Sequence, residues 1–106
     1  MKIIAFVLIL IFGARTVHAS VPDHTESFYV NDFARVLSDE TTQYILNMSE
    51  SLQAQTGAEF VVVTTDFTDG SSVGDYALSI FNAWQLGDRE KNNGLLLFLS
   101  IGDDDY

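Results

Sequence analysis

The chain has 106 residues, enough for one small domain, and a net charge of −10 at neutral pH. This acidity argues against nucleic acid and anionic lipid surfaces as partners, since clustered Lys and Arg recognise both. The chain has no cysteine, which excludes disulfides and thiol chemistry, so the fold must be held by its hydrophobic core.

The first 19 residues have the pattern of a secretory signal peptide. Lys2 supplies a positive charge, residues 3–12 form an apolar run, and Val17-His18-Ala19 places small residues where a signal peptidase cuts. We therefore expect an exported protein, either periplasmic, extracellular or membrane-tethered. A retained membrane anchor is the alternative, although the apolar run is shorter than the roughly 20 residues of a spanning helix. Cleavage would also remove Arg15, leaving fifteen acidic and three basic residues and a net charge of −12.

Two segments precede the first predicted helix. Residues 20–27 are polar and lack periodicity, so we predict a flexible lead-in there and place the domain at residues 28–106. Residues 28–37 carry the turn signal Asn31-Asp32 between apolar residues. This pattern indicates an extended segment whose aromatic side chains contact the core.

The first helix is predicted from Ser38 to Thr56. Ser38 is a good N-cap, and the carboxylates of Asp39 and Glu40 lie in the first turn, where they face the positive end of the helix dipole. Gly57 provides the stop. Helical spacing predicts an apolar stripe made of Thr41, Tyr44 or Ile45, Met48 and Leu52.

A strand and a second helix follow. Residues 59–65 are rich in β-branched side chains and predict a central strand. After a loop, Ser72 and Asp75 fit a capping box, which starts a helix that we expect to end at Gly87. The predicted apolar stripe of this helix is Val73, Tyr76, Ala77, Ile80, Phe81 and Trp84.

The apolar run at residues 94–101 is the strand around which we expect the rest of the domain to be organised. An uninterrupted run with turn residues at both ends predicts a strand buried on both faces. Together with residues 59–65 and the intervening helix it makes a βαβ unit, so the two strands should be parallel with a right-handed crossover. The predicted fold class is α/β, a three-layer α/β/α sandwich with a parallel βαβ core.

Two parallel strands alone would both be edges of their sheet. An open edge along residues 95–99 would favour aggregation, because its unpaired backbone groups lie beside apolar side chains. We therefore predict that the chain is the N-terminal part of a larger domain. Its next strand would follow a hairpin turn at residues 102–105.

No strong catalytic motif is present: the sequence lacks a phosphate-binding loop, HExxH, GxSxG and a cysteine nucleophile. His24 lies in the lead-in, which disfavours a histidine base or metal ligand. The candidate chemistry lies in four acids. Asp103, Asp104 and Asp105 follow a strand at its carboxyl end, where open α/β sheets place ligands, and Asp32 could join them. Carboxylates suit calcium or magnesium, so we predict a divalent-cation site, with a solvated acidic turn as the alternative.

Three segments, in this order and spacing, resemble the TPM domain family. They are residues 29–38, residues 56–64, and Asp75-Tyr76-Ala77 with Phe81, Trp84 and Gly87 leading to Asn93-Gly94-Leu95-Leu96-Leu97. The resemblance covers nearly all of residues 28–100. It implies a three-layer α/β/α domain carried by exported, often membrane-tethered bacterial proteins and by thylakoid-lumen proteins linked to photosystem II repair.

The resemblance implies no single activity, because some members are described as acid phosphatases, some bind calcium, and an animal branch modulates acetylcholine receptors. Asp32 matches the Asp of the family's Val-Asn-Asp turn, and residues 103–105 fall at its acidic turn after the central strand. The family's following strand, its Gly-x-Gly segment and its closing helices have no counterpart in these 106 residues.

We therefore expect an extracytoplasmic TPM-domain module with an acidic divalent-cation site, non-catalytic or weakly catalytic, acting with a membrane or envelope protein in assembly, maintenance or interaction. The alternative is a metal-assisted acid phosphatase. In it, Asp32 and Asp103 or Asp104 hold the ion, which polarises a phosphoryl oxygen and generates the attacking hydroxide. No basic residue is obviously placed to clamp a phosphate, which favours the module. The partner, the substrate and the oligomeric state stay open.

Overall fold

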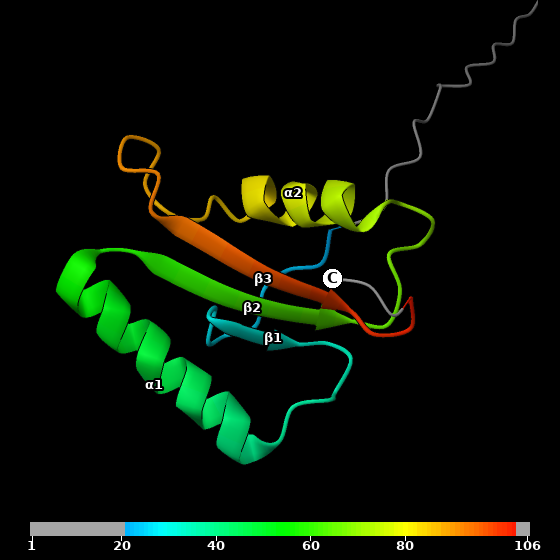
Figure 1. Cartoon of the computed structure of the whole chain (residues 1–106), viewed down its shortest axis with the longest axis horizontal. Helices are drawn as coiled ribbons and strands as arrows, with labels where there is room; N and C mark the ends of the chain where they lie inside the picture. Colours follow the sequence, from blue (N-terminus) through cyan, green and yellow to red (C-terminus); the bar gives the residue numbers. More distant parts are fainter. Residues whose placement is uncertain (1–20, 104–106) are drawn as a thin grey trace, which may run out of the picture.

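The computed structural model of the chain describes residues 21–103, so the predicted signal peptide and residues 104–106 lie outside the described residues (Figure 1). Three parallel strands form one sheet in the order β1-β2-β3. One helix covers each face, which gives three layers. This arrangement confirms the predicted α/β class with a parallel βαβ core. The elements are β1 (Val30–Asp32), α1 (Asp39–Thr56), β2 (Glu59–Thr65), α2 (Val73–Ala83) and β3 (Gly94–Ser100).

The central strand of the sheet is β2. Val62 pairs with Val30 of β1 on one side and with Leu97 of β3 on the other. Within residues 21–103, β3 pairs with β2 alone, and its Leu95 is 61% exposed. The prediction that residues 94–101 form a strand buried on both faces is therefore wrong. An apolar run shows that a strand has hydrophobic neighbours, but its periodicity does not distinguish a central strand from an edge strand.

The extended segment predicted before the first helix contains a third strand, β1. Its pairing with β2 continues beyond its ends, because the amide of Val62 donates to the carbonyl of Tyr29 at 2.9 Å and the amide of Phe33 donates to the carbonyl of Thr64 at 3.1 Å. The consequence is that Asp32 lies at the carboxyl end of the sheet, directly beside Thr64.

Helix α1 begins and ends as predicted. The Ser38 hydroxyl accepts a hydrogen bond from the amide of Thr41 at 3.0 Å, and Gly57 ends the helix in a left-handed conformation with φ of 79°. These two signals are local, so the sequence alone was enough to place both ends of the helix.

The predicted apolar stripe of α1 is wrong. Tyr44, Met48 and Leu52 are exposed, and the buried residue on the side that faces the sheet is Ser49, flanked by half-buried Ile45. Since three apolar residues follow one another at positions 44–46, two stripes one position apart fit the sequence almost equally well. Of the two alternatives Tyr44 and Ile45, Ile45 is the one that is half-buried in the structure.

Helix α2 packs as predicted, since its whole apolar stripe belongs to the core or contacts it. Its start is also confirmed, because the Ser72 hydroxyl accepts from the amide of Asp75 at 3.1 Å. The helix ends at Ala83, before the predicted Gly87. Gln85 adopts a left-handed conformation, and the amide of Leu86 donates to the carbonyl of Phe81 at 3.2 Å, which closes the helix with a Schellman motif.

The main core lies between α2 and the sheet. Its six buried side chains are Val61, Val63, Tyr76, Ile80, Leu86 and Phe98. Residues 21–27, predicted as a flexible lead-in, instead contact this core: Val21 packs against it, and the indole of Trp84 donates to the carbonyl of Pro22 at 3.0 Å. The lead-in therefore covers part of the sheet face that α2 leaves open.

Candidate functional site

Asp32 closes the loop between β1 and α1 through its carboxylate. Its Oδ1 accepts a 2.6 Å hydrogen bond from the Thr64 hydroxyl and a 3.0 Å bond from the amide of Val36, while its Oδ2 accepts from the amide of Leu37 at 3.0 Å. Thr64 is fully buried, and its hydroxyl oxygen also accepts from the amide of Ala34 at 3.1 Å. Asp32 thus ties the first strand, the central strand and the loop into one unit.

The electrostatics of Asp32 follow from these contacts. Partial burial acts to raise the pKa of the carboxyl, but the hydrogen bonds from Thr64, Leu37 and Val36 outweigh it and hold the pKa below its usual value. The carboxylate is therefore ionised at neutral pH. It accepts hydrogen bonds and has no proton to give to a leaving group.

Asp103 plays a similar part at the end of β3. Its Oδ2 accepts from the Ser100 hydroxyl at 2.8 Å and from the amide of Thr68 at 3.1 Å. The hydroxyl of Thr68 donates to the carbonyl of Ser71 at 2.6 Å and also lies 3.3 Å from the same carboxylate oxygen. Asp103 therefore fixes the loop between β2 and α2 against the turn that follows β3.

Hydrogen bonds from the Ser100 hydroxyl and the Thr68 amide also lower the pKa of Asp103. Asp103 differs from Asp32 in one respect that matters for ligand binding. It is exposed, and its Oδ1 accepts no hydrogen bond from residues 21–103. By contrast, both oxygens of Asp32 accept hydrogen bonds, from its own loop and from Thr64.

Of the four predicted ligands, the structure describes Asp32 and Asp103, and it places both at one end of the sheet. Asp32 ends β1 and Asp103 follows β3, with β2 between the two strands. No group of three or more acidic, histidine or cysteine side chains suited to a metal ion occurs among residues 21–103. Asp104 and Asp105 lie outside the described residues, so the four-residue cation site stays a prediction.

The sequence analysis did not single out two residues near the carboxyl end of the sheet, Asn31 and Arg35. Asn31 is fully buried; its Oδ1 accepts from the amide of Thr25 at 2.7 Å and its Nδ2 donates to the carbonyl of Phe28 at 2.8 Å. Arg35 is exposed in the loop after Asp32 and adopts a left-handed φ of 58°. The turn signal Asn31-Asp32 could have indicated the first, since Asn side chains often bond nearby backbone in turns.

The comparison with known families agrees with this architecture. A family model of the TPM domain matches residues 30–106. The chain belongs to the TPM domain family. The matched region begins at β1, so in this TPM domain Asn31 anchors residues before the match, and Asp32 anchors the loop that follows β1. No curated protein matches the chain.

Neither helix of the described TPM domain is long and apolar enough to cross a lipid bilayer.

Proposed function

We propose that this TPM domain is an extracytoplasmic module that acts by binding, in the assembly or maintenance of membrane or envelope proteins, rather than by catalysis. The observation that carries the proposal is the use made of Asp32 and Asp103. Both carboxylates accept hydrogen bonds that hold loops at the carboxyl end of the sheet. Side chains committed to loop structure are poor candidates for a reaction that would change their charge or position.

The lowered pKa values of both carboxyls support the same proposal. A general acid must hold its proton near the working pH, which requires a raised pKa. Asp32 and Asp103 have the opposite shift, caused by the hydroxyl and amide donors around them. Proton donation by these two residues is therefore disfavoured.

We include a divalent cation, calcium or another, in the proposed function. Of the predicted ligands in the described region, Asp103 fits this role through its Oδ1, which accepts no hydrogen bond from residues 21–103, and Asp104 and Asp105 follow it in the sequence. Asp32 is less suited as a ligand, because each of its oxygens already accepts at least one hydrogen bond. A bound hard cation would neutralise part of the acidic turn and stabilise it.

Metal-assisted hydrolysis of phosphomonoesters is the second candidate function. One observation favours it: Arg35 is exposed three residues after Asp32, in the loop at the same end of the sheet. A guanidinium there could bind a phosphate through paired hydrogen bonds. Arg35 provides the cation that sequence reasoning did not find.

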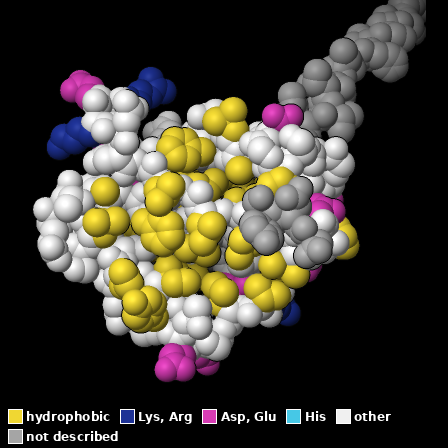
Figure 2. Space-filling model, viewed as in Figure 1, with side chains coloured by type: hydrophobic (Ala, Val, Ile, Leu, Met, Phe, Trp, Pro, Cys, Tyr) yellow, Lys and Arg dark blue, Asp and Glu magenta, His cyan; other side chains and the backbone are white. Residues whose placement is uncertain are grey.

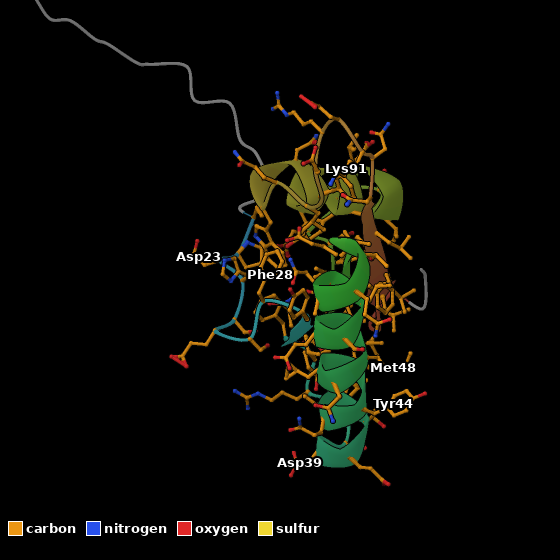
Figure 3. All side chains as sticks on the ribbon, turned by 90° about the vertical axis from the view of Figure 1, so that its left-hand side faces the viewer. Asp23, Phe28, Asp39, Tyr44, Met48 and Lys91 are labelled. Atoms are coloured by element: carbon orange, nitrogen blue, oxygen red, sulfur yellow. The ribbon has the colours of Figure 1, made fainter. Side chains whose placement is uncertain are left out.

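The experiment uses the full-length gene product. It compares the wild-type protein with its Asp103→Asn, Asp32→Asn and Arg35→Ala variants, and with Asp23→Asn as a charge-matched control. Asp23 is exposed in the lead-in, before β1 (Figure 3). Thermal unfolding is followed during calcium titration, and p-nitrophenyl phosphate hydrolysis is assayed in parallel. A ligand selective for the folded state must raise the melting temperature.

The binding module predicts a calcium-dependent rise in melting temperature in the wild type and in Asp23→Asn, a smaller rise in Asp103→Asn, and no hydrolysis. Hydrolysis that disappears in Asp32→Asn or Arg35→Ala would overturn the proposal in favour of the phosphatase. Identical calcium responses in Asp103→Asn and Asp23→Asn would remove the cation from the proposed function.

A further inference from the structure

Asn93, the residue directly before β3, holds the amino end of the sheet together. Its Oδ1 accepts from the amide of Asp88 at 2.7 Å, and its Nδ2 donates to the carbonyl of Gly57 at 3.2 Å. Its backbone carbonyl accepts from the amide of Glu59 at 3.0 Å. Asn93 therefore joins the end of α1, the start of β2 and the loop between α2 and β3.

The next residue, Gly94, is packed too closely for a side chain. A Cβ placed on it would lie 2.7 Å from both the carbonyl carbon and the carbonyl oxygen of Leu86, and 2.9 Å from the amide nitrogen of Gly87. That amide is itself held, because it donates to Oε1 of Glu59 at 2.7 Å. Position 94 therefore requires glycine, while position 93 uses a side chain with both an acceptor and a donor.

These two residues form an Asn-Gly pair, the dipeptide in which asparagine is chemically least stable. With no Cβ on the second residue, its backbone nitrogen can readily reach Cγ of the asparagine. The four other asparagines among the 106 residues precede residues that carry a side chain: Asn31, Asn47, Asn82 and Asn92. The fold therefore places the most reactive asparagine of this sequence at a junction of three elements.

The reaction of this pair is deamidation. The backbone nitrogen of Gly94 attacks Cγ of Asn93 and forms a C–N bond, while the Nδ2 group takes up the proton of that nitrogen and leaves as ammonia. Water then opens the cyclic succinimide at one of its two ring C–N bonds, which gives either aspartate or isoaspartate. Water is the sole co-reactant.

The native contacts oppose the first step of this reaction. The side chain of Asn93 is held at both its oxygen and its nitrogen, so Cγ cannot move to the nitrogen of Gly94 until the bonds to Asp88 and Gly57 break. The bond from Glu59 to the carbonyl of Asn93 also restrains the peptide group that must enter the ring. The folded state therefore holds the pair in an unreactive arrangement.

The loop that carries Asn93 is suited to local opening. Residues 88–92 are exposed, whereas Asn93 is half-buried. Figure 2 shows this loop projecting from the molecule at the upper left, with the basic side chains of Arg89 and Lys91 in dark blue. Exposed loops open at a lower free energy than the core does. The reactive arrangement is therefore reached without unfolding the sheet.

We propose that Asn93-Gly94 is a site of spontaneous deamidation, which the native bonds at the amino end of the sheet hold inactive and which opening of the loop activates. Aspartate at position 93 cannot donate to the carbonyl of Gly57, and its charge faces the negative end of the α1 dipole. Isoaspartate lengthens the main chain before β3 and disturbs the pairing of Glu59 with Gly94. Each opening that leads to reaction therefore leaves a permanent weakening of this end.

Peptide mapping by mass spectrometry tests the site and its protection. The full-length gene product is kept at mildly alkaline pH, in buffer and in urea, and conversion of Asn93 is compared with that of Asn82, which is exposed and precedes alanine. In urea Asn93 should convert much faster than Asn82. In buffer its conversion should be more than about tenfold slower than in urea, because two side-chain hydrogen bonds must break first.

A substitution that installs the aspartate product tests its consequence. Asn93→Asp should lower the melting temperature of the full-length gene product, because the bond to Gly57 is lost. Asn92→Asp is the matched control, since it adds the same charge one position earlier on an exposed side chain, and it should lower the melting temperature less. Equal conversion of Asn93 in buffer and in urea, conversion in urea no faster than that of Asn82, or equal melting temperatures of the two variants would each overturn the proposal.

Discussion

Strands β2 and β3 have the same length and each has a run of apolar residues, yet they occupy different environments. Val61, Val62 and Val63 of β2 are buried on both faces, whereas Leu95 and Leu97 of β3 remain exposed on the face that α1 does not reach. The difference arises from neighbours and not from the strands themselves. Similar apolar runs can therefore differ in burial, according to which elements of the described region lie beside them.

The largest expected effect contrasts one residue of each strand. Val61→Ala should reduce the free energy of unfolding by about 2 kcal/mol, because it removes buried methyl groups and leaves a cavity. Leu95→Ala should change the stability of the monomer by less than about 0.5 kcal/mol, since most of that side chain is already in water. Urea unfolding at low protein concentration checks both values. Equal losses would show that β3 is as buried as β2.

The next effect concerns the anchor of the lead-in. Asn31→Ala should cost about 2 kcal/mol, because it leaves the Thr25 amide and the Phe28 carbonyl without their partner. In the same variant the lead-in should detach from the core. Its detachment should change the intensity or wavelength of Trp84 fluorescence, because the indole donates a hydrogen bond to the carbonyl of Pro22. A stable variant with unchanged fluorescence would contradict the anchoring role.

Asp32→Asn is expected to cost about 1 kcal/mol at neutral pH, because an amide can replace only one of the two accepting oxygens. The folded-state pKa of Asp32 lies below its ordinary value of about 3.9, so the unfolded chain binds its proton first as the pH falls. The stabilisation is complete above pH of about 4 and is lost below it. Urea unfolding of the two proteins at neutral pH and at about pH 3 should therefore show a difference that shrinks on acidification. A constant difference would exclude the carboxylate as its source.

Asp103→Asn should have the smallest effect on stability, because the carboxylate is exposed and only one of its oxygens is engaged. Its local effect should be larger, since the loop of Thr68 loses an ionised acceptor. Faster amide exchange at Thr68 with little change at Val63 would agree with this role. Slowed exchange there would contradict it.

The parts of the fold that depend on short-range signals could be predicted from the sequence. Ser38 and Ser72 cap their helices, Gly57 ends the first one, and the predicted apolar stripe of α2 lies on the face that contacts the core. These features depend on residues within a few positions of one another, so the pattern contains the information needed.

The remaining features depend on contacts between distant segments. Which strand is central was decided by β1, a three-residue strand too short to give its own signal. The face of α1 was decided by the sheet beneath it, and the contact of the lead-in by a hydrogen bond between Pro22 and Trp84. At the candidate site, the sequence placed Asp32 and Asp103 at the same end of the sheet, but it could not show that hydroxyl and amide donors already occupy them.

Residue-level amide exchange along β3 tests the central claim most directly. The amides of Leu97 and Leu99 point toward β2 and should be protected at every protein concentration. The amides of Leu96 and Phe98 point away from β2, and in this 106-residue chain they should exchange faster than the amides of Leu97 and Leu99. Equal protection of all four amides would contradict the account.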